Sequence, residues 1–90
     1  MYTVGLTPKD AQIKIAEQIK ALRKAAGFTQ AELAKRAQCS LGSYKRFEST
    51  GLIAFDALLR IAFVLKRLEQ MTTPFAYSPE PDFNQLFKNA

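Results

Sequence analysis

The stretch that decides the fold is TQAELAKRAQCSLGSYKRFE, residues 29–48. Thr29 is followed three residues later by Glu32, which is the pattern of a capping box, where two side chains satisfy unpaired backbone N–H groups at a helix start. Leu33 and Ala37 then recur at helical spacing. The first half of the stretch therefore predicts a helix of about two turns.

The second half of the stretch predicts another short helix after a tight turn. Residues 38–39 interrupt the pattern, and Ser40 is a suitable N-cap for a helix over residues 41 to about 49. Tyr44 and Phe47 share one face of that helix, which we assign to the core. The side chains left toward solvent are those of Ser40, Leu41, Ser43, Lys45 and Arg46, with Gly42 near the start. A packed helix followed by a basic, outward one is what a helix-turn-helix reader of DNA requires.

Length and charge restrict the class of protein. Ninety residues form one domain with a modest core and little room for an internal catalytic cleft. A net charge of +5 and a pI near 9.6 favour an acidic partner, either nucleic acid or an anionic membrane surface. Residues 20–46 carry seven cations and one anion, whereas residues 69–90 carry three anions and one cation. The positive charge thus coincides with the two short helices, which favours double-stranded DNA.

Several classes of function lack the residues that they need. With no histidine and a single cysteine, Cys39, we expect no metal site, no cofactor and no nucleophile–base pair, and therefore no enzyme. One cysteine cannot form an intrachain disulfide. No apolar run reaches the roughly 18 residues that cross a membrane, and the N-terminus lacks the layout of a secretory signal. We therefore expect a cytoplasmic protein that does not bind membranes.

A longer helix is predicted ahead of the central pair. Thr7 is its N-cap, Pro8 takes the first helical position and Gly27 ends it, so that it spans about residues 8–26. Phe28, directly after the stop, is expected to fold back into the core. The apolar residues that recur at spacings of four, three and four, and so predict its core stripe, are Ile15, Ile19, Leu22 and Ala26.

A fourth helix is predicted to begin near Phe55, after a break at residues 49–51. Its expected core stripe consists of Phe55, Leu58, Leu59, Ala62 and Leu65. Four further apolar residues make the apolar face of this helix wider than a surface helix needs. They are Ile61, Phe63, Val64 and Leu68. Either neighbouring helices wrap this helix in a small bundle, or the additional face meets a second copy of the chain.

Residues 73–90 differ in character from the domain predicted for residues 1–72. Their prolines restrict the backbone to extended conformations, yet the segment is too apolar for a simple solvated tail. Either the tail packs back on the domain or it anchors a partner, and we favour a tail that docks on another surface. For contacts with a partner or a dimer mate we single out Ile61, Val64, Leu68, Phe75, Tyr77, Phe83, Leu86 and Phe87.

At residues 23–48 the sequence resembles the lambda-repressor-like helix-turn-helix family, also called the Cro or XRE type. The resemblance is carried by Arg23, Gly27–Gln30, Ala31–Ala34 and the pair Phe47–Glu48, and it extends over about residues 8–68. It implies an all-α, compact five-helix fold in which the second and third helices read DNA. Here an extended tail rich in proline and aromatic residues follows that fold.

The resemblance also implies roles for individual residues. Gln30 would hold a DNA phosphate at the start of the second helix, and Ala34 would let the two reader helices cross closely. Arg23 and Glu48 would form a buried structural ion pair, since burying either charge alone costs several kcal/mol. The residues that would face the major groove or its flanking phosphates are Ser40, Leu41, Gly42, Ser43, Lys45 and Arg46, to which we add Lys35 of the second helix.

Two departures from the family pattern affect these expectations. The family's usual glycine at the turn is replaced by Gln38, which must accept an unusual backbone angle unless the turn differs. The start of the third helix also lacks the glutamine and asparagine side chains that contact adenine through two hydrogen bonds. The operator sequence therefore stays undetermined.

Residues 43–48 and 58–62 resemble, more narrowly, the HipB-like antitoxins encoded beside HipA-type kinase toxins, which bind their operators as dimers and also hold the toxin. We therefore predict a homodimeric repressor of a palindromic operator that serves as the antitoxin of such a module and regulates its own operon. Two alternatives are a protein inhibitor that acts chiefly by binding a toxin through its C-terminal region, and a stand-alone XRE-type regulator without a toxin.

Overall fold

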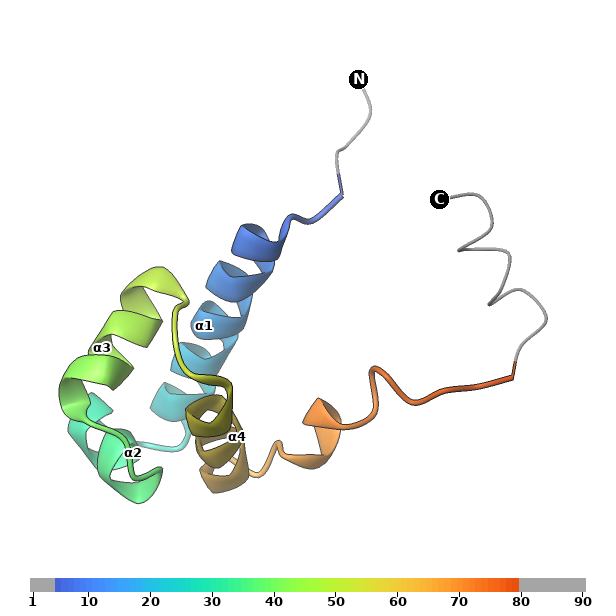
Figure 1. The fold of residues 1–90 in the computed structure, drawn as a ribbon. Helices are drawn as coiled ribbons and strands as arrows, with labels where there is room; N and C mark the ends of the chain where they lie inside the picture. Colours follow the sequence, from blue (N-terminus) through green and yellow to red (C-terminus); the bar gives the residue numbers. More distant parts are fainter. Residues whose placement is uncertain (1–4, 80–90) are drawn as a thin grey trace.

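The computed structural model describes residues 5–79, in which every regular element is helical (Figure 1). The elements are α1 at Pro8–Ala25, α2 at Gln30–Arg36, α3 at Leu41–Thr50, α4 at Phe55–Val64 and a 3-10 helix, η1, at Glu69–Met71. The predicted all-α class is confirmed. In the described residues the fifth element is only a 3-10 turn, so the expected count of five helices is not established.

The first three helices each begin at a residue whose side chain accepts a backbone hydrogen bond. Thr7 and Asp10 form a capping box at the start of α1, as Thr29 and Glu32 do at the start of α2. Ser40 caps α3 by accepting the N–H of the residue three positions later at 3.1 Å. Because these bonds span only three residues, the sequence alone predicted all three helix starts.

Helices α1, α2 and α4 end in the same motif, in which a left-handed residue follows the helix and two N–H groups bond back to its last carbonyls. The left-handed residues are Gly27 (φ 79°), Gln38 (φ 58°) and Lys66 (φ 60°). After α2 the N–H groups of Gln38 and Cys39 donate to carbonyls of the last helical turn at 3.1 and 2.9 Å. Gln38 thus adopts the unusual backbone angle that the sequence analysis required of it.

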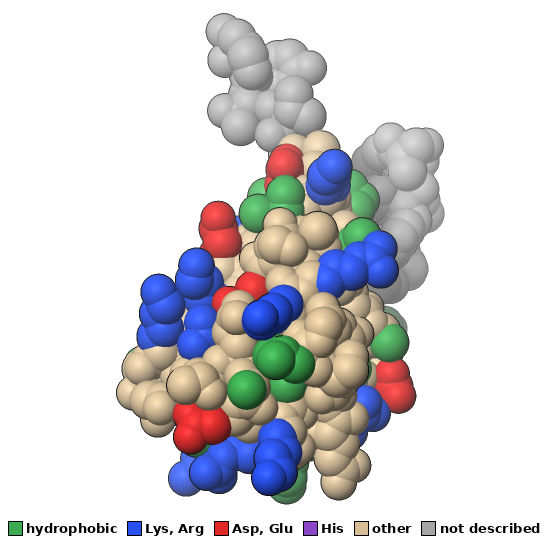
Figure 2. All heavy atoms as spheres, turned by 90° about the vertical axis from the view of Figure 1, so that its left-hand side faces the viewer, with side chains coloured by type: hydrophobic (Ala, Val, Ile, Leu, Met, Phe, Trp, Pro, Cys, Tyr) green, Lys and Arg blue, Asp and Glu red, His purple; other side chains and the backbone are tan. Residues whose placement is uncertain are grey.

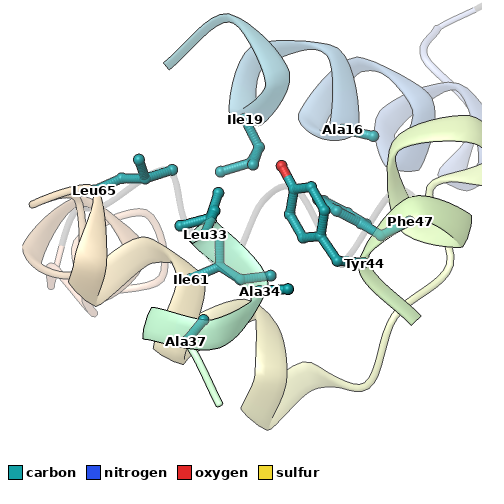
Figure 3. Packing of buried hydrophobic residues seen from close by; sticks show 9 residues of the cluster. All are labelled: Ala16, Ile19, Leu33, Ala34, Ala37, Tyr44, Phe47, Ile61 and Leu65. Atoms are coloured by element: carbon teal, nitrogen blue, oxygen red, sulfur yellow. The ribbon is translucent and has the colours of Figure 1, made fainter. Parts of the chain in front are cut away.

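The core lies where α2, α3 and α4 meet α1 (Figure 3). Its largest fully buried side chains are those of Leu33, Tyr44, Phe47 and Ile61, and smaller residues complete the cluster. The rings of Tyr44 and Phe47 meet edge to face with their centroids 6.1 Å apart. Helical spacing had predicted that Leu33, Tyr44 and Phe47 would be buried, and this is confirmed.

Four predictions about apolar faces are wrong. Ile61, assigned to partner contacts, is 0% exposed, so it belongs to the core and cannot contact a partner. Phe55 and Ile15, assigned to core stripes, are 68% and 38% exposed. Ala26, assigned to the core stripe of α1, is exposed as well. Periodicity shows how wide the apolar part of a helix is, but the neighbouring elements decide which edge is covered. The core around α2 covers the edge of α4 that carries Ala57 and Ile61, which leaves Phe55 outside.

Gly51 marks the point where the end of α3 touches α1. It has φ 80°, and its N–H donates to the carbonyl of Phe47 at 2.7 Å. A Cβ atom on this residue would lie 2.8 Å from the backbone carbonyl of Gln12 in α1. Backbone conformation and close approach therefore both require glycine at this position.

Gly51→Ala should lower the free energy of unfolding by about 3 kcal/mol, because a left-handed alanine is strained and its methyl group would push α1 away. The measurement is urea denaturation followed by circular dichroism. Gly27→Ala is the matched control, since Gly27 has φ 79° but a Cβ there would meet no atom within 4 Å. The control should lose only about 1 kcal/mol. Equal losses in the two variants would contradict the role of the contact with α1.

Candidate nucleic-acid interface

The inner face of helix α3 packs against the core, and its outer face is exposed to solvent. Tyr44 and Phe47 are buried, whereas the side chains around them are exposed. The exposed residues are those that the sequence analysis assigned to DNA contacts on this helix: Leu41, Gly42, Ser43, Lys45 and Arg46, preceded by the exposed Ser40. In Figure 1, α3 forms one side of the molecule, and the described tail through Pro79 runs off the opposite side.

The face that contains α2 and α3 is rich in positive charge. Figure 2 views it directly and shows Lys and Arg side chains spread over it, with an apolar patch between them. Lys35 and Arg36 come from the last turn of α2 and are exposed. The Arg36 guanidinium lies 4.6 Å from the centroid of the Phe28 ring, so Phe28 orients this cation. Such a surface attracts a polyanion.

Behind α3, a single carboxylate joins three helices. The side chain of Glu48 is only 5% exposed and accepts hydrogen bonds from Arg23 Nε at 2.7 Å and Arg23 Nη2 at 3.2 Å. It also accepts from Gln30 Nε2 at 2.9 Å and from the hydroxyl of Tyr44. Arg23 Nη1 donates in addition to the carbonyl of Phe28 at 2.9 Å. We call these four side chains, those of Arg23, Gln30, Tyr44 and Glu48, the Glu48 network.

The electrostatics of the Glu48 network fix the protonation state of each member. Burial acts to raise the pKa of the Glu48 carboxyl, but donors from Arg23, Tyr44 and Gln30 outweigh it, and the pKa lies below its ordinary value. Burial and the bond to Glu48 raise the pKa of the Tyr44 hydroxyl. The hydrogen bond to Glu48 raises the pKa of Arg23. At neutral pH the network therefore contains one anion, one cation and a neutral phenol that donates.

Two residues assigned to DNA contacts have structural partners of their own. The side-chain amide of Gln30 donates to Glu48, so Gln30 links the start of α2 to the end of α3, and its phosphate contact stays a prediction. Ser40 Oγ accepts the N–H of Ser43 at 3.1 Å, which leaves its O–H as the group for a base or phosphate. Gly42 has no atom within 4 Å of the position of a Cβ, so internal packing does not require glycine there.

Arg60 of α4 is a positioning residue that the sequence analysis missed. Its Nε donates to the carbonyl of Ala37 at 2.8 Å, and its Nη2 lies 3.5 Å from the carbonyl of Gln38. Its Nη1 donates to Asp56 at 3.1 Å. Arg60 thus holds the end of α2 and the turn that leads into α3. The spacing of four between Asp56 and Arg60 was a readable signal, but the contact with a turn more than 20 residues away was not.

The residues assigned to a partner or a dimer mate fall into three groups. Ile61 is excluded by its burial. Val64 is half-buried, and those exposed are Leu68 (37%), Phe75 (90%) and Tyr77 (73%). Phe83, Leu86 and Phe87 lie outside the described residues. Surface apolar area on α4 is larger than expected, since Phe55 and Phe63 are each 68% exposed.

The sequence matches a protein family described as "Helix-turn-helix domain" over residues 14–71, which is more than half of the chain. The matched range contains α2, α3 and α4 entirely, together with every member of the Glu48 network. Comparisons with curated proteins and with solved structures give no match. Across residues 5–79, no helix is both long enough and apolar enough to cross a bilayer.

The Glu48 network should make stability depend on pH in acid. Because the folded pKa of Glu48 lies below its ordinary value, its contribution is complete above about pH 5 and is lost as the pH falls through the folded pKa. Glu48→Gln should remove part of this dependence, and at pH 7 it should cost about 3–5 kcal/mol because Arg23 is left buried without its anion.

Denaturant unfolding between about pH 3 and pH 7 measures this effect. Glu17→Gln is the matched control, since Glu17 is exposed on α1, and it should leave the pH profile of the native chain unchanged. A Glu48→Gln profile that runs parallel to that of the native chain would show that another carboxylate is responsible.

Arg60→Gln should loosen the turn between α2 and α3. Loss of the bonds to the carbonyls of Ala37 and Gln38 should lower the free energy of unfolding by about 1–2 kcal/mol. Native-state hydrogen exchange should speed up at the amides of residues 38–40. Arg67→Gln is the control, because among the hydrogen bonds described the Arg67 side chain donates only to the carbonyl of its neighbour, Lys66. Unchanged exchange at the turn in the Arg60 variant would remove its positioning role.

Proposed function

The chain belongs to the helix-turn-helix domain family, and from this premise we propose that it is a sequence-specific, DNA-binding transcriptional regulator that acts as a repressor. The observation that carries the proposal is the exposed, basic outer face of α3, supported from behind by Tyr44, Phe47 and the Glu48 network. The proposal includes no enzymatic activity and no cofactor, and it places the protein in the cytoplasm.

In the proposed complex α3 enters the major groove with its N-terminal residues against the base edges. Lys45 and Arg46 neutralise phosphates that flank the groove. Ser43 and the O–H of Ser40 offer short hydrogen-bonding groups to bases, and Leu41, 39% exposed, offers an apolar contact for a thymine methyl group. Lys35 on α2 adds a further phosphate contact.

A homodimer of the XRE type is part of the proposal. One short reader helix covers few base pairs, and two helices that bind half-sites about 34 Å apart supply useful affinity for a palindromic operator. Phe55, which is 68% exposed on α4, supports a further contact surface on the chain.

A second candidate function is that of an antitoxin. Phe75 is 90% exposed in an arm that leaves the domain, and the resemblance to HipB-like proteins suggests that such an arm holds a HipA-like kinase toxin while the domain autoregulates the operon. The main role of the protein would then be to inhibit the toxin by binding it through the C-terminal region. A kinase-like reading frame directly beside this gene would favour the antitoxin over a stand-alone regulator.

The DNA-binding role is tested with Lys45→Ala and Arg46→Ala. Fluorescence anisotropy with a labelled random-sequence duplex gives the affinity at several salt concentrations. Each variant should lose one phosphate contact, which lowers the slope of log K against log salt by about 0.9 and weakens binding about fivefold to tenfold at ~0.1 M salt.

Lys14→Ala is the matched control for the loss of one charge. Lys14 is exposed on α1, on the side opposite the buried residues Ala16 and Arg23. The Lys14→Ala variant should change the slope of log K against log salt much less than the Lys45 and Arg46 variants do. If all three variants shift binding equally, the cations act only through net charge, and α3 is not the reader.

A further inference from the structure

Two hollows lie along the junction of α1 and α4. The wider one, of about 370 Å³, is lined on α1 by Leu22 and Ala26 and at the end of α4 by Val64 and Leu65. The narrower one, of about 130 Å³, is lined by Ile15 and Leu58 among others. Leu22 follows Ile15 by seven positions, as Leu65 follows Leu58, so each pair lies on one stripe of its helix.

We call the two hollows together the α1–α4 groove. It contains the residues that helical periodicity assigned to the core but that the structure leaves partly open, such as Ile15, Leu22 and Ala26. Lys66 and Arg67 lie at the wider end. A ligand for the groove needs an apolar face at helical or extended spacing, with anions where it meets these two cations.

The chain itself contains a segment with this chemistry. Residues 80–90, EPDFNQLFKNA, lie outside the described residues. Phe83, Leu86 and Phe87 stand at the i, i+3, i+4 spacing with which a peptide presents one apolar side to a groove. Glu80 and Asp82 precede them and supply the anions that Lys66 and Arg67 require.

The direction of the described tail indicates which copy of the groove receives this segment. After η1 the chain runs outward from the domain to Pro79 (Figure 1). Pro74 and Pro79 each restrict the preceding residue to extended backbone, and Pro81 follows. Return to its own groove would require the chain to reverse between Pro79 and Phe83, whereas a second copy can meet the segment without a reversal.

We infer that residues 82–87 dock in the α1–α4 groove of a second copy of this chain, and that the reciprocal contact closes a two-fold dimer. The inference rests on the proposed function and extends it by stating how the dimer forms. The evidence for the contact is the groove and the tail sequence, and it does not depend on DNA binding. Reciprocal exchange uses the same surface on both copies and ends at two chains. It leaves the outer face of α3 uncovered, since α3 and the exit of the tail lie on opposite sides of the domain (Figure 1).

A complementation experiment on the full chain tests the exchange. The tail variant is Phe83→Ser with Phe87→Ser, and the groove variant is Ala25→Glu with Ala26→Glu. Both alanines are exposed at the wider hollow, so the folded state should tolerate them, while their carboxylates oppose apolar docking and repel Asp82. In sedimentation velocity each variant alone should dimerise at least tenfold more weakly than the native chain.

An equimolar mixture of the two variants should form a heterodimer, because the intact tail of the groove variant meets the intact groove of the tail variant. The matched controls are Phe75→Ser for the tail and Ala21→Glu, exposed on α1 outside both hollows, for the groove. Both controls should dimerise like the native chain. Circular dichroism melts establish that all variants are folded.

Three results would overturn the inference: a tail variant that dimerises as the native chain does, a mixture that stays monomeric because each tail serves its own domain, or a native chain that is monomeric throughout. Duplex binding measured on the same samples separates these outcomes from a failure of the DNA-binding role, since a monomer that binds DNA through Lys45 and Arg46 leaves that role intact.

Discussion

The orientation of α3 depends on the buried carboxylate of Glu48. This group lies near the end of α3 and receives donors from Arg23 of α1, Gln30 of α2 and Tyr44 of α3 itself. A buried ion pair adds little net stability, because removing two charges from water offsets most of their attraction. Separating the pair is costly, however. A shift of α3 relative to α1 would leave Arg23 or Glu48 unpaired in the interior, so the network selects one geometry among many of similar apolar burial.

Two other contacts complete the frame around α3. At its start, Arg60 holds the carbonyls of the preceding turn from α4. At its end, Gly51 lets the chain approach the backbone of Gln12 more closely than any residue with a Cβ atom could. Together with the Glu48 network, these contacts fix both ends and the inner face of the helix. On the proposed function α3 has to match a DNA groove, and such preorganisation favours binding because less ordering remains to be done.

Short-range signals made the helix boundaries predictable, and long-range packing limited the rest. Thr7 and Thr29 indicated helix starts because their bonds span three residues, and Gly27 indicated a helix end because glycine accepts a left-handed angle without strain. The burial of Ile61 and the exposure of Phe55, each the reverse of what was predicted, could not be read in this way. Which edge of α4 is covered depends on α2, which is far away in the sequence. Likewise, the expectation of an Arg23–Glu48 pair came from a family resemblance, because side chains 25 residues apart share no local pattern.

The side chains on α3 indicate where specificity for an operator would have to arise on the proposed function. Ser40 already caps the helix, Gly42 has no side chain, and Leu41 offers only an apolar contact. Lys45 and Arg46 supply charge, which binds phosphates of any sequence nearly equally well. A single reader helix therefore has few groups that distinguish one base pair from another, and a bare half-site would be bound weakly and with little discrimination. Discrimination then has to come from the spacing of two half-sites and from the shape of the DNA between them. In the proposed dimer both would depend on how rigidly the two copies are joined, so the surface that joins them would contribute to DNA recognition as much as α3 does.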